Sequence, residues 1–469
     1  MIVRTRFSPS PSGALHLGNI RTALYCWLYA NKYNGEFILR IEDTDFDRSR
    51  DDYTQNIFDT LKWLGLFWTQ GPYYQSKRLN KYNEILEKLL NENKAYRCYC
   101  TKERLNDLRI TQLKSKKKPK YDRYCRNINI FLDMPFVIRF KNPDEGSVHF
   151  HDGIYGDIII NNCELDDLII VRSDGIPTYN FAAVVDDIDM KVTDIIRGAD
   201  HITNTARQIN IYNSLESSLP KFYHIPVILN NVGKRLSKRL TSASITYFNN
   251  SGFLSHALLN YLLMLGWSYY DKEIFTLNEM IEFFDIKKIH LSSVRFDSKK
   301  LLWYNRYYIR NLPVKIVIEN ISFYLKNINV CFKIYPNIED IFLLQKFRIN
   351  TLLDFVKNNI YFYKIEINYN DDVNIILYDK LFFITEQIYI YFNEKNYIWN
   401  NTSIKNILLN LSNNNDIIFN DLSQFLRIII TGNFSSPPLV DVIFLIGKIF
   451  LLSRIYNIRY IYKLFVNNY

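Results

Sequence analysis

A histidine at the start of a predicted helix is the first residue of this sequence that could take part in phosphate chemistry. The stretch 8–13, Ser-Pro-Ser-Pro-Ser-Gly, breaks regular structure, and His16-Leu17-Gly18-Asn19 follows where helical periodicity begins. Free N–H groups and the helix dipole favour anions at a helix N-terminus. His16 could donate a hydrogen bond to a phosphate oxygen, and Gly18 would let a base or ribose approach the backbone. Alone, a His-x-Gly motif is more often an ordinary surface loop.

The second candidate phosphate site is the basic stretch that begins at Gly233. Lys234 and then Arg235-Leu236-Ser237-Lys238-Arg239 follow that glycine, far along the chain from His16. Basic residues on a mobile loop can close over a triphosphate, and Lys suits a leaving pyrophosphate because its ammonium is a compact point charge. Alone, such a run is more often a solvated turn.

These two stretches need a scaffold that brings them together. Val3 to Phe7 and Phe37 to Glu42 have the pattern of buried strands, and Leu15 to Asn31 between them has helical periodicity. The strand–loop–helix–strand order predicts a parallel α/β sheet of the Rossmann type. We expect Leu168 to Arg172 and Val192 to Gly198 to be returning strands of this sheet.

The composition of the sequence changes near residue 96, where a polar, basic segment with alternating strands begins. Beyond about residue 244 the pattern is mostly helical. Leu439 to Ser453 is the most apolar stretch, but it is short for a membrane span and contains Asp441 and Lys448, so it predicts a buried helix. The predicted regions are two Rossmann catalytic halves (1–95 and 168–243), an α+β insertion (96–167), a helical domain (244–318) and a helical C-terminal region (319–469).

The charge of the chain favours a polyanionic partner. Its 469 residues include 58 Lys+Arg and 48 Asp+Glu, a formal net charge of +10, and residues 102–126 alone hold ten Lys/Arg against three Asp/Glu. Strand-like sequence begins at Ile2 and leaves no room for a targeting segment, and there are six Cys. We therefore expect a cytoplasmic protein with free or metal-bound thiols and no membrane association.

The two motifs together resemble the signature motifs of class I aminoacyl-tRNA synthetases. Wider stretches look like bacterial glutamyl-tRNA synthetase up to about residue 310: Thr5–Gly13, Arg21–Tyr25, Arg40–Asp45, Ser173–Tyr179 and Arg197–His201. Two residues depart from the class pattern. Asn19 stands where the class has a second His, which glutamyl enzymes commonly lack, and Arg235 stands where Lys is usual.

The resemblance implies a two-step reaction. L-glutamate and ATP, with Mg²⁺, give glutamyl-adenylate and pyrophosphate, and glutamate then passes to the 3′-terminal adenosine of tRNA(Glu). It assigns His16 to the α-phosphate and Lys238 to the β- and γ-phosphates, and it implies a monomer that needs bound tRNA for activation. The implied ATP-binding set is His16, Gly18, Asn19, Arg235, Leu236, Ser237, Lys238 and Arg239.

The glutamate pocket follows from the two carboxylates and one ammonium of this substrate. Arg6 and Arg197 occupy the family's positions for carboxylates, which planar guanidinium groups bind bidentately. Glu42 can hold the ammonium, and the hydroxyl groups of Ser10 and Tyr179 can add hydrogen bonds. By residue type alone, each Arg would more often form a structural ion pair. We expect the nearby pair Asp186-Asp187 to be structural or to face tRNA.

A cysteine cluster is expected in the insertion. Some relatives carry Cys-x-Cys, a spacer and Cys-x-His, which bind structural zinc; here Cys98, Cys100 and Cys125 are followed by Asn127. Thiolates suit zinc but four ligands are expected, and an amide is a poor one. Zinc held by three Cys with water or a distant His is one alternative. A metal-free remnant with buried thiols is the alternative that the incomplete set favours.

The remaining regions are expected to bind tRNA. The resemblance assigns the basic insertion to the acceptor end, 244–318 to the stem and 319–469 to the anticodon. The basic residues that could follow an RNA backbone are Lys287, Lys288, Arg295, Lys299 and Lys300. Three alternatives are less consistent with the sequence: a glutaminyl enzyme has a β-barrel anticodon region, a queuosine-modifying relative lacks the C-terminal domains, and a binding paralogue would have lost the motifs. Whether tRNA(Gln) is also charged stays open.

Overall fold

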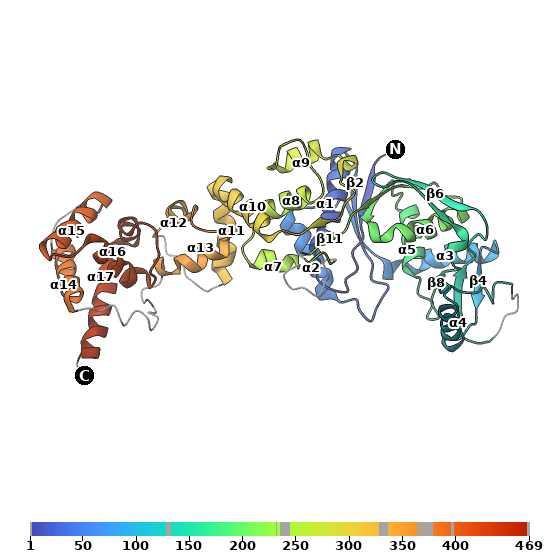
Figure 1. The fold of residues 1–469 in the computed structure, drawn as a ribbon, viewed down its shortest axis with the longest axis horizontal. Coiled ribbons are helices and arrows are strands. Elements are labelled where there is room, and N and C mark those ends of the chain that lie inside the picture. The colour runs from blue at the N-terminus through green and yellow to red at the C-terminus, as the bar shows by residue number, and fades with distance from the viewer. Residues whose placement is uncertain are drawn as a thin grey trace. The chain divides into compact units, whose positions relative to one another are not determined.

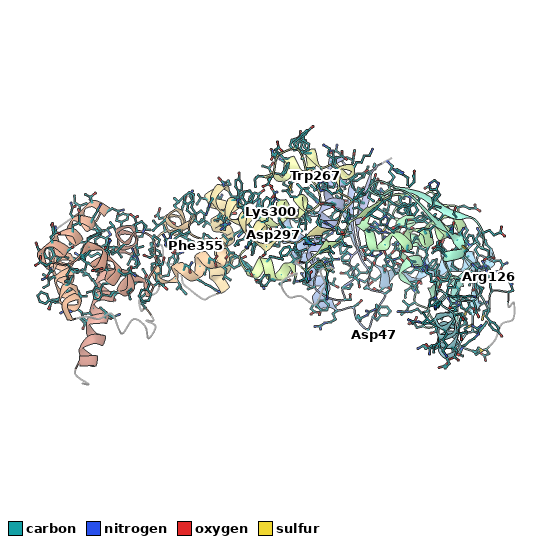
Figure 2. All side chains as sticks on the ribbon, in the orientation of Figure 1. Asp47, Arg126, Trp267, Asp297, Lys300 and Phe355 are labelled. Atoms are coloured by element: carbon teal, nitrogen blue, oxygen red, sulfur yellow. The ribbon has the colours of Figure 1, made fainter. Side chains whose placement is uncertain are left out.

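The computed structural model describes residues 2–127, 133–230, 232–234, 244–327, 336–363, 367, 379–394 and 398–466. The chain divides into two compact units (Figure 1). One unit is Met1–Asn249 with Ser255–Leu301, and the other is Asn250–Leu254 with Leu302–Tyr469. Figure 2 shows a core residue of each: Trp267 is fully buried in the first unit, and Phe355 is buried in the second. No helix among the described residues is long and apolar enough to cross a membrane.

Two sheets form the α/β core of the first unit. β1 (Arg4–Phe7), β2 (Glu36–Ile41) and β3 (Gln70–Tyr74) pair in parallel, with β2 in the centre. The second sheet has the order β7-β6-β10-β9, in which β6 (Ser147–Asp152), β9 (Asp194–Gly198) and β10 (Lys221–Ile225) are parallel. Only its edge pair, β6 with β7 (Gly156–Asn161), is antiparallel. The predicted α/β fold of the Rossmann type is therefore confirmed.

The two sheets meet at β1 and β9. The backbone N–H of Thr193 donates to the Arg4 carbonyl (3.0 Å), and the Arg4 N–H donates to Thr193 Oγ1 (2.8 Å). The Cys26 thiol in α1 (Leu17–Lys32) contacts the carbonyls of Arg6 and Ile196 at 3.4 and 3.6 Å, so it spans both strands. The strands therefore run β3-β2-β1-β9-β10, and the order reverses between β1 and β9. Ligands of open α/β sheets bind at such a switch point, at the carboxyl ends of the strands.

The helices that flank this core begin where the sequence patterns change. α1 buries Leu17, Ile20, Leu24 and Leu28 on one face, as the predicted periodicity requires. The other helices of the core are α2 (Asp51–Leu64), α3 (Leu79–Asn91, after the short η1 at Gln75–Arg78), α5 (Tyr179–Asp189) and α6 (Ile202–Ser214, after η3 at Ala199–His201). β2 is buried at every position after Glu36, which is typical of a parallel strand covered on both faces.

A three-stranded antiparallel sheet lies at the predicted insertion and includes the strand that follows it. β4 (Ala95–Cys98), β5 (Val137–Phe140) and β8 (Ile169–Val171) pair in that order, and α4 (Lys102–Lys114) has no buried residue. The prediction that Leu168 to Arg172 returns to the catalytic sheet is wrong, because β8 pairs with β5. The β6–β7 hairpin, expected in the insertion, extends the catalytic sheet instead. A short apolar run indicates a strand but does not indicate its partner.

The rest of the first unit is mainly helical. Its elements are η2 (Asn162–Glu164), β11 (Ile228–Leu229), α7 (Ile245–Asn250), α8 (Ser255–Met264), α9 (Leu277–Phe283), η5 (Ile286–Lys288), β12 (Val294–Arg295) and the start of α10 (Ser298–Asn311). Asp297 caps α10 by accepting the N–H groups of Lys299 and Lys300 at 2.8 and 3.2 Å (Figure 2). β11 pairs with β12, so the chain leading to the second motif is fixed by residues near 295.

The second unit is built from helices in its described residues. They are α11 (Val314–Asn327), α12 (Ile338–Gln345), α13 (Leu352–Asn359), η6 (Ile360–Phe362), α14 (Asp379–Glu394), α15 (Asn401–Asn414), α16 (Phe419–Thr431) and α17 (Leu439–Val466). The stretch Leu439 to Ser453 is helical, as predicted, but only one side of it is buried. Val442, Ile443 and Ile446 are buried, whereas Ile449 is 82% exposed, and Gly447 breaks α17 with a φ of 83°. Arg454 is buried and donates to the carbonyls of Ile430 and Tyr361, which joins α17 to α16 and η6.

Candidate active site

His16 closes the N-terminus of α1 with its own side chain. Its Nδ1 accepts the backbone N–H groups of Gly18 (3.1 Å) and Asn19 (3.3 Å), and Asn19 Oδ1 accepts the N–H of His16 (3.2 Å). This reciprocal arrangement is a capping box. Because Nδ1 accepts, the hydrogen of the neutral ring is on Nε2. The helix terminus thus holds a ring whose Nε2–H can serve as a donor.

The small residue at position 18 is explained by this ring. A Cβ on Gly18 would lie 3.0 Å from His16 Cε1 and 3.1 Å from Nδ1. Gly18 therefore leaves room for the His16 side chain, in addition to any room it leaves for a nucleotide. Asn19, which stands in place of the second class I histidine, completes the cap.

The second motif, Arg235 to Arg239 with Lys238, lies outside the described residues. Both ends of the chain around it are described. Before it, Asn230 N–H donates to the Lys234 carbonyl (2.7 Å), and Gly233 has a φ of +78°. After it, Ser244 forms an antiparallel bridge with His16, and Ile245 N–H donates to the Leu15 carbonyl (3.1 Å). The chain that carries the second motif therefore returns to the first motif.

All five residues predicted to hold glutamate line one cavity of about 380 Å³. The cavity lies at the carboxyl ends of β1, β2 and β9, where the strand order reverses. Its lining residues are Arg6, Phe7, Ser8, Pro9, Ser10, Asn19, Thr22, Glu42, Tyr179, Ile196, Arg197, Gly198 and His201. An adjoining cavity is lined by His16, Gly18 and Arg21 and by the chain 225–228, and it shares Asn19, Thr22, Gly198 and His201 with the first. Two connected cavities suit a substrate pair.

Arg197 is a buried cation whose hydrogen-bond partners are neutral. Its Nε donates to His224 Nε2 (3.2 Å), its Nη2 to Thr205 Oγ1 (2.6 Å) and its Nη1 to the Tyr179 hydroxyl (3.5 Å). The residue is 6% exposed, and within the described part of the chain no carboxylate forms an ion pair with it. Burial of an uncompensated charge costs several kcal/mol. The Arg197 guanidinium is therefore suited to an anionic ligand in the cavity.

Arg6 has a different environment, because a carboxylate already contacts it. Its Nε lies 3.3 Å from Asp187 Oδ1. The same oxygen accepts from Arg40 Nη1 (2.6 Å), and Arg40 is fully buried. Burial would raise the pKa of Asp187, but the guanidinium groups of Arg40 and Arg6 outweigh it and hold that pKa below its usual range. The ion pair predicted from residue type alone is thus present at Arg6.

The pair Asp186-Asp187 is structural. Asp186 is fully buried and accepts from Arg78 Nε (2.7 Å), Gln75 Nε2 (2.8 Å) and the Tyr82 hydroxyl (3.0 Å). Of the two roles expected for this pair, the structural one fits the burial of both side chains. The network fixes the N-terminal part of α3 against α5, and therefore also the position of Tyr179 at the start of α5.

Glu42 follows β2 and faces the cavity with 14% of its side chain exposed. Burial raises its pKa to about 7, although Arg40 and Arg6 partly oppose the shift. The nearest cation is Arg40, whose Nη2 lies 3.7 Å from Glu42 Oε1. A carboxyl group with this pKa is only partly ionised near neutral pH, and an ammonium ligand would favour its charged form.

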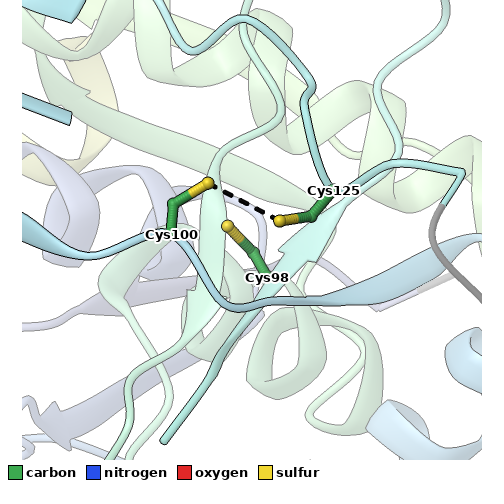
Figure 3. Close-up of side chains that lie close together, drawn as sticks. All are labelled: Cys98, Cys100 and Cys125. Atoms are coloured by element: carbon green, nitrogen blue, oxygen red, sulfur yellow. Dashed lines mark hydrogen bonds between the residues drawn. The ribbon is translucent and has the colours of Figure 1, made fainter. Parts of the chain in front are cut away.

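Three cysteines of the insertion converge at the end of β4. The sulfur atoms of Cys98, Cys100 and Cys125 all lie within 4.8 Å of one another (Figure 3). The Tyr121 hydroxyl is 3.3 Å from Cys98 Sγ and 3.5 Å from Cys100 Sγ, and it accepts the N–H of Cys125 (3.0 Å). The three sulfurs can reach one metal ion, but a structural zinc site takes four ligands and Asn127 carries an amide. The donor set of the motif is one ligand short.

The basic residues predicted to face RNA are exposed. The exposed residues are Lys287, Lys288, Arg295, Lys299 and Lys300, together with Lys114, Lys116, Lys117, Lys118 and Lys120 in and after α4. Three of these side chains have protein partners. Lys300 pairs with Glu273 (2.8 Å), Lys288 lies over the ring of Tyr269, and Lys120 Nζ donates to the Cys163 carbonyl (2.9 Å). Their position allows contact with a polyanion.

Sequence reasoning assigned no role to several residues of this site. The Ser8 hydroxyl lines the cavity and is buried without a hydrogen-bond partner in the described structure. His201 lines both cavities, and its Nδ1 lies at hydrogen-bond distance from the Tyr179 hydroxyl (3.3 Å). Burial lowers the pKa of His201 to about 4. His201 lies in the stretch Arg197–His201, which resembles the family, and this resemblance could have indicated a role for it. Nothing in the local sequence singled out His224 or Thr205.

Models of two protein families match the chain. The model of the class I tRNA synthetase catalytic domain for E and Q matches residues 2–303, and the model of an anticodon binding domain matches residues 324–459. The glutamate–tRNA ligase of Buchnera aphidicola (subspecies Cinara cedri) is 48% identical over 454 residues, 96% of this chain and 95% of the relative. That of Legionella pneumophila (strain Paris) is 45% identical over 455 residues, 96% of each chain.

A solved structure supports the same assignment. A glutamate tRNA ligase from Elizabethkingia meningosepticum, in complex with its amino acid, superposes with a TM-score of 0.82 at 29% sequence identity. The match covers 97% of this chain and 99% of the solved one. The family models, the full-length relatives and the two cavities at the switch point all agree. This chain belongs to the glutamate–tRNA ligases, a family of class I aminoacyl-tRNA synthetases.

Proposed function

We propose that this protein activates L-glutamate with ATP and transfers it to the 3′-terminal adenosine of tRNA(Glu). The observation that carries the proposal is the cavity at the carboxyl ends of β1, β2 and β9. Its five proposed glutamate ligands supply two cations, one carboxyl group and two hydroxyl groups, and they come from four separate segments of sequence. Glutamate offers the complementary set of two carboxylates and one ammonium.

In this proposal the glutamate carboxylates bind Arg6 and Arg197. Arg197 has neutral partners, so its charge is available to one carboxylate, while Arg6 shares its charge with Asp187. Glu42 holds the ammonium, and Ser10 and Tyr179 add hydroxyl contacts. The planar guanidinium groups favour a carboxylate over an amide, because an amide offers one acceptor and no charge.

ATP is proposed to bind in the adjoining cavity at the start of α1. His16 donates Nε2–H to the α-phosphate as charge develops there, and Lys238 neutralises the β- and γ-phosphates. Gly18, Asn19, Arg235, Leu236, Ser237 and Arg239 complete the proposed ATP set. Support comes from the His16 capping geometry and from the return of the chain at Ser244 to His16. Mg²⁺ would accompany ATP and offset phosphate charge.

The chemistry needs positioning and charge stabilisation more than covalent catalysis. The glutamate α-carboxylate attacks the α-phosphorus and pyrophosphate leaves, giving glutamyl-adenylate. A terminal hydroxyl of the tRNA then attacks the acyl carbon and AMP leaves. We propose that activation requires bound tRNA, as the family resemblance implies, and that the enzyme acts as a monomer in the cytoplasm.

The tRNA is proposed to contact three regions. The insertion (96–167) meets the acceptor end, where the exposed lysines near α4 supply positive charge. Residues 244–318 contact the stem, and 319–469 contact the anticodon; the anticodon binding domain match at 324–459 supports the latter. The helical elements of this region in the described residues are unlike the β-barrel expected of a glutaminyl enzyme.

A direct test is ATP–pyrophosphate exchange with L-glutamate, with and without tRNA(Glu), followed by charging of tRNA(Glu) and tRNA(Gln). We expect exchange only with tRNA present and charging of tRNA(Glu). No exchange by the purified protein, even with tRNA, would exclude the enzyme function. Charging of tRNA(Gln) at a comparable rate would extend the substrate range.

The pKa of Glu42 predicts a pH-dependent KM for glutamate. The substrate ammonium binds the ionised carboxylate, so a proton on Glu42 competes with it. With a pKa of about 7, one-proton competition raises the KM for glutamate about tenfold between pH 8 and pH 6. Initial rates of aminoacylation across this range, at saturating ATP, measure it. Glu42→Gln should give a high KM that no longer changes with pH; a wild-type KM that is flat over this range contradicts the assignment.

Removal of the Lys238 charge is predicted to affect activation far more than tRNA binding. Loss of a charged hydrogen bond costs about 1.5–3 kcal/mol, so Lys238→Ala should slow ATP–pyrophosphate exchange at least about tenfold. The Kd for tRNA(Glu), measured by filter binding, should change little. Equal losses in exchange and in tRNA affinity would refute the phosphate role of Lys238.

The incomplete cysteine cluster predicts a protein with little zinc. Three sulfurs and Asn127 do not supply four good ligands. We expect elemental analysis of the purified protein to find far less than one zinc per chain, and dialysis against EDTA to leave aminoacylation unchanged. One zinc per chain that is lost in Cys125→Ser would show that a further ligand completes the site.

A further inference from the structure

The side of Arg197 that faces away from the cavity meets a buried polar cluster of three residues. His224 on β10, Thr205 on α6 and Asp152 at the end of β6 are each fully buried, and Arg197 is 6% exposed. None of the first three lines either cavity described above. His224 and Thr205 contact the guanidinium, and Asp152 contacts His224, so the effect of all three on any reaction acts through Arg197.

Asp152 sets the orientation and tautomer of the His224 ring. Its Oδ2 is 2.6 Å from His224 Nδ1, and the same carboxylate accepts the backbone N–H groups of His224, Ile154 and Tyr155 at 3.1, 3.0 and 2.9 Å. Burial would raise the pKa of Asp152, but these hydrogen bonds lower it below its usual range. An ionised Asp152 requires the hydrogen of His224 on Nδ1.

The other nitrogen of His224 is therefore an acceptor. Burial lowers the pKa of His224, which keeps the ring neutral and leaves a lone pair on Nε2. That lone pair faces Arg197 Nε–H at 3.2 Å and the Thr205 hydroxyl at 2.8 Å. Thr205 Oγ1 in turn accepts from Arg197 Nη2 at 2.6 Å. Two of the three guanidinium nitrogens are thus held from behind, and the third, Nη1, is directed to Tyr179 at the cavity.

We propose that Asp152, His224 and Thr205 are positioning residues that aim Arg197 at the substrate carboxylate and leave its charge unneutralised. This inference rests on the proposed function, because the substrate carboxylate is that of glutamate. The comparison with Arg6 shows why the acceptors are neutral. Asp187 holds Arg6 through an ion pair, whereas a carboxylate at the position of His224 Nε2 would compensate the Arg197 charge before substrate arrives. With His224 in this place, the nearest negative charge on this side of Arg197 is that of Asp152, which the imidazole ring separates from the guanidinium.

Two substitutions at position 224 separate the two nitrogens of the ring. The amide of Asn reaches about as far as Nδ1, so His224→Asn can still donate to Asp152 but cannot reach Arg197. The amide of Gln reaches about as far as Nε2, so His224→Gln can place an oxygen acceptor against Arg197 Nε. Misplacement of a substrate-binding group by about 1 Å can cost about a hundredfold. We expect His224→Asn to raise the KM for glutamate at least about tenfold and His224→Gln to restore it to within about threefold of wild type.

A second pair of variants, at Thr205, tests the same proposal if the His224 variants do not fold. Thr205→Val keeps the shape and removes the hydroxyl, so the KM for glutamate should rise about tenfold, while Thr205→Ser keeps the hydroxyl and should stay near wild type. The KM for ATP should change less than about twofold in all four variants, because these residues do not contact the ATP cavity. Circular dichroism melting curves identify any variant that is unfolded.

The outcomes distinguish this inference from the proposed function. If wild type does not charge tRNA with glutamate, the proposed function fails and this inference fails with it. If wild type is active but both members of each pair raise the KM for glutamate equally, Arg197 is not positioned through these acceptors. A parallel rise in the KM values for ATP and glutamate would likewise indicate a general structural role and overturn the inference.

Discussion

Arg197→Met is expected to lower kcat/KM for glutamate about a thousandfold, chiefly through the KM for glutamate. The substitution removes the cation opposite a substrate carboxylate in a buried cavity. An uncompensated buried charge costs about 3–5 kcal/mol, which corresponds to roughly two to three and a half orders of magnitude. Steady-state aminoacylation of tRNA(Glu) with varied glutamate measures the effect. The KM for ATP should change little, because Arg197 lines only the glutamate cavity of the two described.

Two further variants make this expectation specific. Arg197→Lys keeps the charge but loses the planar fork that meets His224, Thr205 and Tyr179 at once, so it should fall between wild type and Arg197→Met. Arg48→Met removes an exposed guanidinium that pairs with Asp45 at the surface and should leave kcat/KM unchanged. If Arg197→Met retains the same kcat/KM as Arg48→Met, Arg197 does not bind the substrate carboxylate.

The thermal stability of Arg197→Met should move in the opposite direction from its activity. In the described structure Arg197 has hydrogen bonds to neutral groups but no ion pair, so the unliganded protein bears the desolvation cost of its charge. Replacement of a buried charge by an apolar side chain of similar length is often neutral or stabilising. We therefore expect the melting temperature of Arg197→Met to equal or exceed that of the wild type. Such a trade of stability for function is common at binding sites.

The parts of the fold that could be predicted from the sequence are those with a local cause. α1 lies where helical periodicity predicted a helix, because Leu17, Ile20, Leu24 and Leu28 form one buried face. β2 was predicted from the apolar run Phe37 to Leu39, which is typical of a buried parallel strand. The sheet predicted for β8 was wrong. Its three residues pair with β5, and the partner of a strand depends on contacts between residues distant in sequence. The β6–β7 hairpin shows the same limit, since its membership of the catalytic sheet depends on β10.

The residues of the site also fall into those that the sequence predicted and those that only the structure revealed. The five proposed glutamate ligands come from conspicuous motifs, and all five line one cavity. Asp152, Thr205 and His224 belong to no motif, and their sequence separations conceal a single hydrogen-bonded group. Residues that touch a ligand leave a pattern of chemical type in the sequence. Residues that hold those side chains in place are visible only after the chain is folded.

His16 combines two roles that a single substitution can separate. Its Nδ1 caps α1 by accepting from Gly18 and Asn19, and Nε2 is proposed to donate to the α-phosphate. Asn is among the best N-cap residues, but its side chain cannot also reach a phosphate. His16→Asn should therefore keep the helix capped and lose the catalytic donor. We expect the rate of glutamyl-adenylate formation to fall about 10²–10³-fold, as for loss of one donor to developing charge, with a small change in the KM for ATP.

His16→Ala is the matched comparison for the cap. It should lose the same catalytic factor as His16→Asn, and in addition about 1 kcal/mol of stability because Ala cannot accept the N–H groups of Gly18 and Asn19. Pyrophosphate exchange in the presence of tRNA(Glu) measures the first effect, and denaturant unfolding measures the second. Equal stability losses in the two variants would contradict the capping role. An active His16→Asn enzyme would show that the histidine serves only the helix, and the charge on the α-phosphate would then have to be met by the residues that surround it.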